Sequence, residues 1–291
     1  MSLLNGSLHV LGGEFSCWEG SRTRKHEEYH LLLREDTFLL CKMNSRIVLK
    51  ASDVAAILGR NQYKPRQEVL NDLWKKYAPQ TFTGKTKKDK ADEALSVSSE
   101  AQAVLATALN TKAKDSHDVQ KIYSEALEKV NSDTKLSKEQ KAEVAEHLRS
   151  KVYTTHGTRS EDSTSHKVEA EQGVKWVKDN SFYNYEVCEL GDKKFVVVGK
   201  IDRIEERPDG SKVLVEIKNR TNRLFRRVVE YEMIQVQMYL QMLGLVHARL
   251  VEQYNNQVLS HDITRDEEMW QNVIVPGLEE FCHELNDCME S

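Results

Sequence analysis

Long apolar runs are missing from this 291-residue sequence, and their absence narrows the classes of protein to which it can belong. No stretch of about eighteen apolar residues occurs, so we expect neither a transmembrane helix nor a membrane partner. Residues 1–13 lack a basic segment followed by a long apolar one, so we expect no secretory signal. With 39% hydrophobic and 30% charged residues, the composition is that of a globular chain with a sizeable core.

Cysteine is scarce and shows no metal-binding pattern. The five cysteines are odd in number and form no C-x-x-C pair, which argues against a disulfide framework, a cysteine-based zinc site and an iron–sulfur cluster. We therefore expect a reducing intracellular compartment, such as the cytoplasm or nucleus of a host cell. The ten histidines form no H-E-x-x-H pattern and are interpreted as incidental.

A strong charge of one sign is also absent, since the net charge is −4 and the pI about 6.2. A protein that coats nucleic acid passively is usually basic. An enzyme that holds divalent cations on carboxylates need not be, because the metal and a local basic patch supply the positive charge. The overall charge therefore does not decide between an enzyme acting on nucleic acid and another enzyme.

The composition changes along the chain and predicts its organisation. Residues 1–45 have no clear pattern and are interpreted as an N-terminal extension, and residues 46–291 as one domain. Within it, residues 84–150 are rich in Lys, Glu, Ala and Ser and contain no Trp, Phe or Pro, which predicts a helical insertion. The insertion is interpreted as solvated helices, with an arch that guides DNA as the alternative.

Period-two patterns follow a helix expected from about 159 to 178. They predict strands at 186–190, 194–202 and 212–218, with a turn at Arg207-Pro208-Asp209-Gly210 that would make the last two strands a hairpin. Helical patterns return at 228–245 and 269–289, with another strand at 250–253. The order predicts an α/β (α+β) fold with a central mixed sheet flanked by helices.

The predicted hairpin carries the residues best suited to chemistry. Glu216 and Lys218 alternate with apolar residues and so share one face, and Asp202 ends the preceding strand. If the register brings them together, the two carboxylates would bind Mg²⁺ or Mn²⁺ and Lys218 would orient water or neutralise developing charge. Alternatively, these residues are only polar positions on a wet sheet face.

The spacing of these residues resembles a known family. Gly199-Lys200-Ile201-Asp202, followed fourteen residues later by Glu216-Ile217-Lys218, is similar to the motif of the PD-(D/E)xK nucleases. More narrowly, the chain resembles the lambda-exonuclease, or YqaJ-type viral recombinase, branch over about residues 44–83 and 151–285. The resemblance implies a restriction-endonuclease-like fold and a metal held by Asp202, Glu216 and the Ile217 backbone carbonyl. The first active-site strand reads Gly-Lys-Ile-Asp and not Pro-Asp, since Ile201 precedes Asp202, but the proline is often missing in this superfamily.

Three further segments carry this resemblance. Gly157-Thr158-Arg159-Ser160-Glu161 is similar to the helix motif that supplies a metal-site glutamate, here Glu161. Gln235-Val236-Gln237 is similar to the Q-x-Q helix, which implies catalytic roles for Gln235 and Gln237. Ser45-Arg46 and residues 51–59 resemble the segment that binds the DNA 5′ phosphate, which implies that Arg46 and Ser52 bind it.

Basic side chains are concentrated directly after Lys218. Arg220, Arg223, Arg226 and Arg227 form the densest cationic run in the chain, and we expect them to contact the phosphates of a DNA strand. The Arg46 guanidinium could make a bidentate contact with a terminal phosphate. Ser52 is expected to cap a helix whose exposed N–H groups would also bind the phosphate. The alternatives are a solvated loop and an ordinary helix cap.

Together these observations predict a metal-dependent exonuclease that hydrolyses DNA from free ends. The resemblance implies 5′-to-3′ digestion of duplex DNA in viral or phage-type recombination, a ring-shaped homotrimer and a partner that anneals single strands. A single-strand-specific nuclease on the same scaffold and a catalytically silent DNA-binding module are the alternatives. Strand preference, polarity, processivity and oligomeric state do not follow from the sequence.

Overall fold

The structure, a computed structural model, describes residues 45–291, so the extension predicted for 1–45 lies outside the described residues except for Ser45. The strands are β1 (Ser45–Lys50), β2 (Trp176–Val177), β3 (Tyr183–Leu190), β4 (Lys193–Gly199), β5 (Arg203–Glu206), β6 (Lys212–Asn219), β7 (His247–Tyr254) and β8 (Gln257–Thr264). The helices are η1 (Ala51–Asp53), α1 (Val54–Ile57), α2 (Arg66–Tyr77), α3 (Lys87–Val97), α4 (Ser99–Asn110), α5 (Ser116–Ser132), α6 (Lys138–Gln172), α7 (Glu230–Leu243), α8 (Glu267–Met269), η2 (Trp270–Ile274) and α9 (Val275–Glu290).

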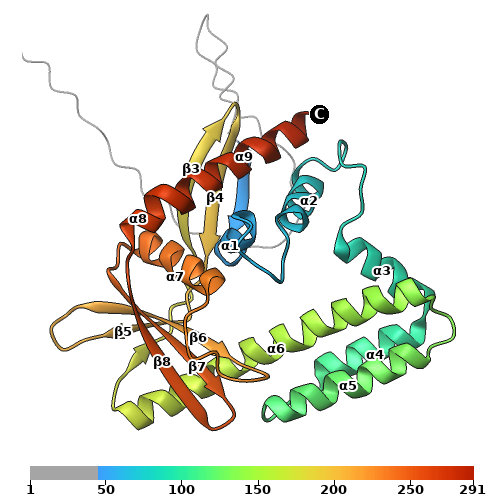
Figure 1. The fold of residues 1–291 in the computed structure, drawn as a ribbon, viewed down its shortest axis with the longest axis horizontal. Helices are drawn as coiled ribbons and strands as arrows, with labels where there is room; N and C mark the ends of the chain where they lie inside the picture. The colour runs from blue at the N-terminus through green and yellow to red at the C-terminus, as the bar shows by residue number, and fades with distance from the viewer. Residues whose placement is uncertain (1–44) are drawn as a thin grey trace, which may run out of the picture. The chain divides into compact units, whose positions relative to one another are not determined.

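Strands and helices mix as predicted, and the predicted fold class is confirmed. The strands form two mixed sheets, one in the order β1-β4-β3 and one in the order β2-β5-β6-β7-β8. In the first, β1 runs parallel to β4; in the second, β6 runs parallel to β7. Helices α1, α7 and α9 pack against the first sheet's strands and against one another (Figure 1).

The strand predicted over 194–202 is in fact two strands, and this division positions the site. β4 ends at Gly199 in the first sheet and β5 begins at Arg203 in the second. The hairpin partner of β6 is therefore β5, with Arg203 opposite Val215, and not the longer strand that the sequence suggested. A side chain at Gly199 would clash, because its Cβ would lie 2.5 Å from the Tyr239 ring and 2.7 Å from Ala51.

Helix α6 is longer than predicted and joins two parts of the fold. A capping box at Ser137 and Gln140 opens it, and the helix then continues through the segment 159–172 without a break. Its first half packs with α3, α4 and α5 around a separate apolar core that includes Leu148, and its second half places Val168 against β6 and β7. Figure 1 shows this helix running from the α3–α5 layer to the second sheet.

The helical segment predicted over 269–289 contains a π-helical turn. The π-helical turn, Trp270–Ile274, leads directly into α9, and Pro276 lies in the first turn of α9. Gly277 allows Leu58 to pack close, since a Cβ there would lie 2.1 Å from Leu58 Cδ2. Among residues 45–291, no helix has the length and apolar character needed to cross a bilayer.

Candidate active site

Asp202 and Glu216 lie side by side at the point where β5 begins. Since Arg203 pairs with Val215, the preceding residue Asp202 comes opposite Glu216, and the Ile217 N–H donates to Asp202 Oδ2 over 2.8 Å. The N–H and C=O groups of a strand residue point to the same neighbouring strand. The Ile217 carbonyl therefore faces the side on which Asp202 lies, as expected of a third oxygen in the same site.

Lys218 and Gln235 complete a hydrogen-bonded group around Glu216. Lys218 Nζ donates to Glu216 Oε1 over 2.9 Å and to Gln235 Oε1 over 3.1 Å. The Gln235 amide donates to the same Glu216 oxygen over 3.2 Å and to the Tyr239 hydroxyl over 3.2 Å. β6 and the facing side of α7 thus hold the ammonium and the amide on one oxygen of Glu216.

The other oxygen of Glu216 is buried and has no hydrogen-bond partner among the described residues. An unpartnered carboxylate oxygen in the interior is costly, and burial followed by the Asp202 carboxylate raises the pKa of Glu216 to about 7. Burial also raises the pKa of Asp202. Burial by itself lowers the pKa of Lys218, but the carboxylates around it, Glu216 first, outweigh that effect and the pKa is raised. The group thus has one ammonium for two carboxylates.

Glu161 faces this group from α6. It makes no hydrogen bond or ion pair with the residues that the structure describes, yet burial and then the Asp202 carboxylate raise its pKa to about 7. Glu161 in turn contributes to the raised pKa of Glu216, although no hydrogen bond joins the two side chains. Glu161 is therefore a third acid near the site.

Two residues that the sequence reasoning missed fix α6 against the strands. Arg203 is 4% exposed, pairs with Asp162 on α6, and donates from Nη1 to the Asp202 carbonyl over 2.6 Å. Asn219 donates from Nδ2 to the Gly157 carbonyl over 3.0 Å. Both are positioning residues, and their position next to the motif residues Asp202 and Lys218 was the signal available in the sequence.

Gln237 does not join this group, contrary to its predicted catalytic role. Its amide donates to the Thr264 carbonyl over 2.9 Å, and its oxygen accepts from the Asp266 N–H over 2.8 Å. Two residues along a helix differ by about 200° in direction, so Gln235 and Gln237 point to nearly opposite sides of α7. Gln237 ties α7 to the segment after β8, while Gln235 contacts the site.

The donor set suits a divalent ion that prefers oxygen. Two carboxylates and a strand carbonyl are hard ligands, and one of the carboxylate oxygens, on Glu216, is buried without a partner among the described residues. Glu161 is not within the same tight set. Among residues 45–291, the single group of three acidic or histidine residues with ligand atoms within 4.8 Å of one another is Asp115, His117 and Asp118.

That second acidic group lies at the start of α5, where its carboxylates already have backbone partners. Asp115 accepts from the Asp118 N–H over 2.9 Å, and Asp118 accepts from the Lys114 N–H over 3.0 Å. Carboxylates at a helix N-terminus are stabilised by the exposed N–H groups without any metal. The Asp115 group is therefore interpreted as a helix cap.

Arg220 is buried in the fold and not available to DNA, which corrects its predicted role. Its guanidinium donates to Glu232 over 2.5 and 2.8 Å and to Glu252 over 2.8 Å, and it stacks on the Phe225 ring at 4.0 Å. The Glu252 side chain also accepts from the backbone N–H groups of Phe225 and Arg226. These contacts fix the loop between β6 and α7.

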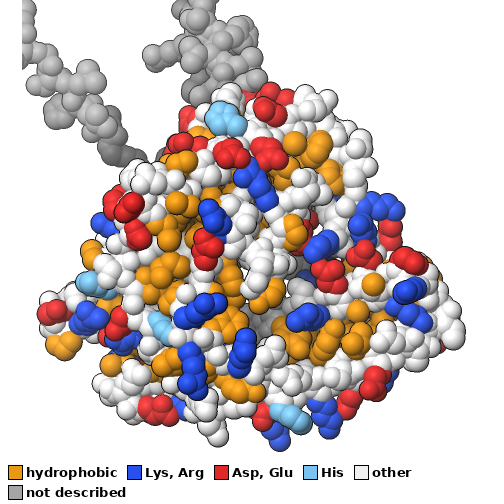
Figure 2. All heavy atoms as spheres, viewed as in Figure 1, with side chains coloured by type: hydrophobic (Ala, Val, Ile, Leu, Met, Phe, Trp, Pro, Cys, Tyr) orange, Lys and Arg blue, Asp and Glu red, His pale blue; other side chains and the backbone are white. Residues whose placement is uncertain are grey.

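The other three arginines of the run are exposed. Arg223, Arg226 and Arg227 form no ion pair or side-chain hydrogen bond within residues 45–291, and they line a hollow of about 610 Å³. Figure 2 shows Lys and Arg side chains gathered in the middle of this face of the molecule. Their position, a few residues after Lys218, is compatible with the predicted contact to phosphates.

Arg46 lies away from the end of β4, whereas Ser52 follows Ala51, which packs against Gly199. Arg46 pairs with Lys194, five residues before Gly199, and at about 3.3 Å per residue it lies roughly 17 Å along the sheet from the end of β4. The parallel pairing of β1 with β4, which the sequence did not indicate, sets this distance. Ser52 is exposed inside η1, and neither η1 nor α1 has a side-chain cap, so Ser52 is not the predicted N-cap.

Comparisons with known proteins identify a family for this chain. The family model of the PD-(D/E)XK nuclease superfamily matches residues 68–285. A search among curated proteins finds no match. An alkaline exonuclease (LHK-Exo) from Laribacter hongkongensis is 15% identical with a TM-score of 0.38, over 68% of this chain and 94% of that one. A phage-related exonuclease from Haemophilus somnus is 11% identical with a TM-score of 0.38, over 83% and 96%.

Proposed function

Because the chain belongs to the PD-(D/E)XK nuclease superfamily, we propose that it is a divalent-metal-dependent deoxyribonuclease whose active site is formed by Asp202, Glu216 and Lys218. One observation carries the proposal: neighbouring strands bring two carboxylates together, and a buried oxygen of Glu216 has no partner. Isolated polar residues on a wet sheet face would be hydrated and would not show the raised pKa of Glu216.

Asp202, Glu216 and the Ile217 carbonyl would hold the metal, and Glu161 would contribute negative charge from α6. A bound Mg²⁺ or Mn²⁺ supplies acidity to a coordinated water and charge stabilisation to the phosphate. Nucleases of this superfamily generally depend on divalent metal ions.

The chain's own residues would orient the reactants. Lys218, held by Glu216 and Gln235, would direct its ammonium group at the attacking water or at the charge that develops on phosphate. Gln235 would add hydrogen-bonding capacity without adding charge, and Tyr239 would fix its amide. Arg223, Arg226 and Arg227 would contact phosphates of the substrate strand beyond the site.

The proposal for the substrate and the direction of cleavage follows from the motif resemblance. The protein would digest duplex DNA from its ends, 5′ to 3′, as part of recombination or DNA processing. It includes an annealing protein as partner and a homotrimer as the assembly. The resemblance also implies a terminal phosphate site at Arg46 and Ser52; of the two, Ser52 lies in η1, which packs against the end of β4, whereas Arg46 lies farther along β1.

The test is digestion of linear DNA labelled at its 5′ or 3′ end, blunt or single-stranded, with Mg²⁺, Mn²⁺ or a chelator. Asp202→Ala and Lys218→Ala should lower the cleavage rate by about 100-fold or more while sparing DNA binding. Asp209→Ala is the matched control, since Asp209 is an exposed acid in the β5–β6 turn that contacts only Ser211. Near-normal cleavage by Asp202→Ala would reject the active site, and release of label from the 3′ end first would reject the polarity.

A further inference from the structure

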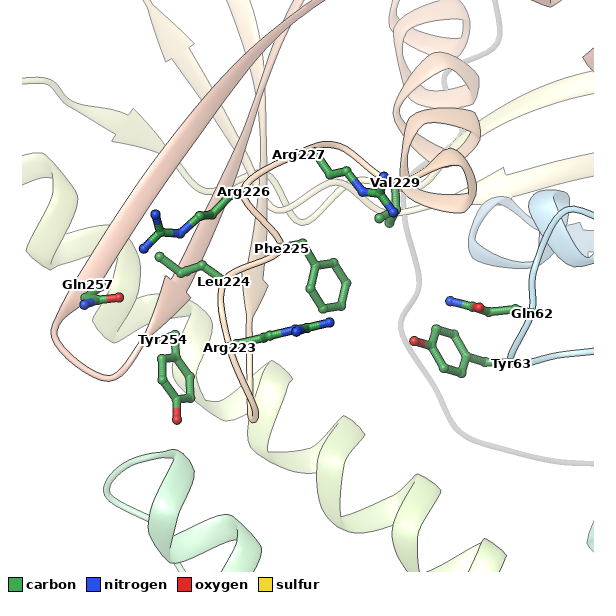
Figure 3. A pocket seen from close by; sticks show the side chains of 10 residues that line it. All are labelled: Gln62, Tyr63, Arg223, Leu224, Phe225, Arg226, Arg227, Val229, Tyr254 and Gln257. Atoms are coloured by element: carbon green, nitrogen blue, oxygen red, sulfur yellow. The ribbon is translucent and has the colours of Figure 1, made fainter.

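The hollow lined by Arg223, Arg226 and Arg227 combines aromatic rings with arginine side chains that have no acidic partner among residues 45–291. Its lining comes from three segments: the loop after β6, the β7–β8 turn and the loop after α1. Figure 3 shows Arg223 and Phe225 between Tyr254 on one side and Tyr63 on the other, with Arg226 and Arg227 along the same loop. A volume of about 610 Å³ is in the range of small-ligand sites.

Tyr63 is the aromatic ring most available to a ligand. It is 64% exposed, and its contact with Tyr231 is edge to face, with centroids 5.7 Å apart and planes at 87°. Phe225 differs, because the Arg220 guanidinium already lies 4.0 Å from the centre of its ring. A large exposed aromatic side chain at the mouth of a basic hollow is a typical platform for stacking.

The cations of the hollow are preorganised by buried contacts. Glu252 is fully buried and accepts from the N–H groups of Phe225 and Arg226, so the backbone from which the arginine side chains extend is fixed. Arg226 has a positive φ of 59°, a conformation that needs such support outside glycine. Arg223, Arg226 and Arg227 then present guanidinium groups without an acidic partner among residues 45–291.

We propose that this hollow, bounded by Tyr63 and Arg223, binds an unpaired nucleotide of a DNA strand. The base would stack on Tyr63, and the flanking phosphates would contact Arg223 and its neighbours. A paired base inside a duplex has both faces covered by its neighbours, so only an unpaired base can use an exposed ring in this way. The inference rests on the proposed function for its choice of DNA as ligand.

The hollow is close enough to the candidate active site to hold the same strand. Tyr231, which contacts Tyr63, is four residues before Gln235 on α7, and side chains with this spacing lie on one face of a helix about 6 Å apart. Gln235 in turn contacts Lys218 and Glu216. A strand whose nucleotide is stacked on Tyr63 would therefore pass directly to the carboxylates.

The experiment measures binding of a fluorescent oligonucleotide of about ten nucleotides in chelator, where no cleavage occurs. Tyr63→Ala should weaken binding of the single strand about tenfold, and Tyr63→Phe should restore it because the ring is retained. Phe182→Ala is the matched control, since Phe182 is a 72% exposed aromatic residue outside the hollow, and it should leave binding unchanged. Arg223→Ala should lower the slope of log affinity against log salt by about one, whereas Lys90→Ala, an exposed cation on α3, should not.

Three comparison ligands identify what the ring recognises. An oligonucleotide of abasic sites should bind wild-type protein and Tyr63→Ala equally, and so should a closed duplex without ends, since neither offers an unpaired base. Free deoxyadenosine monophosphate should bind far more weakly than the strand, because it lacks the flanking phosphates.

Several results would overturn the inference. In the first, Tyr63→Ala and Phe182→Ala weaken binding of the single strand equally. In the second, Tyr63→Ala weakens binding of the abasic oligonucleotide or the closed duplex as much as binding of the single strand. In the third, the mononucleotide binds as tightly as the strand. These outcomes are independent of catalysis. If Tyr63→Ala fails to weaken binding while cleavage persists, only the hollow is misassigned; if the stacking signature holds in a protein that never cleaves, only the proposed function falls.

Discussion

Replacing Glu161 by glutamine should stabilise the metal-free protein at pH 8 and leave its stability at pH 5 nearly unchanged. Burial and the Asp202 carboxylate raise the pKa of Glu161 from 4.5 to about 7 in the folded chain. The folded protein therefore holds this proton more tightly than the unfolded one, and stability is lost as the pH rises from about 4.5 to 7. Glutamine carries no charge at either pH, so its advantage grows across this window and is complete above it.

The magnitude follows from the same pKa. A rise from 4.5 to about 7 corresponds to at most about 3 kcal/mol, and screening by solvent at this half-buried carboxyl reduces the expected value to about 1 kcal/mol. For a domain of this size, 1 kcal/mol moves the Tm by about 2–4 °C. The substitution breaks no hydrogen bond or ion pair among the described residues, so the charge is what changes.

Scanning calorimetry in chelator at pH 5 and pH 8 measures the effect, with wild type and variant compared at each pH. Glu171→Gln serves as the control, because Glu171 is an exposed carboxylate farther along the same helix, and it should change the Tm at neither pH. A lower Tm for Glu161→Gln at pH 8, or the same gain at both pH values, would refute the electrostatic reasoning.

Two further predictions separate site residues from structural ones. Gln235→Ala should slow cleavage with little change in Tm. Gln237→Ala should leave the rate per folded molecule unchanged and cost about 1–3 kcal/mol of stability, because it removes two hydrogen bonds that the buried Gln237 makes to the backbone of Thr264 and Asp266. Initial rates and calorimetry on both variants check this, and the reverse pattern contradicts it. Arg220→Ala should lower the free energy of unfolding by about 3–5 kcal/mol, since it leaves two buried carboxylates unpaired. Urea unfolding measures this change, and an unchanged unfolding midpoint would show that the arginine is not structural.

Local patterns in the sequence predicted the core of the site because strand alternation is a local property. Glu216 and Lys218 contact one another on one face of β6, as their spacing indicated. Asp202 joins them across the β5–β6 pairing, although the sequence assigned it to the end of a longer strand. The division at Gly199 could not be foreseen, since it depends on two separate sheets and on how close Tyr239 and Ala51 approach.

The sequence-based expectations for Arg220 and Arg46 missed contacts between segments that are distant in the sequence. A run of arginines looks the same in sequence whether it faces solvent or buried acids, and only the positions of Glu232 and Glu252 show that Arg220 is internal. Arg46 lies away from the end of β4 because of the parallel pairing of β1 with β4, which is set by tertiary structure. Gln237 is different, because helical periodicity already places Gln235 and Gln237 on opposite sides of α7.

The most direct measurement is Mn²⁺ binding, followed by electron paramagnetic resonance of the free ion during titration of the protein. Wild-type protein should bind the ion, Asp202→Asn should bind it much more weakly, and a double variant Asp115→Asn with Asp118→Asn should bind like wild type. Unchanged binding by Asp202→Asn, together with loss in the double variant, would contradict the account and move the metal to the start of α5.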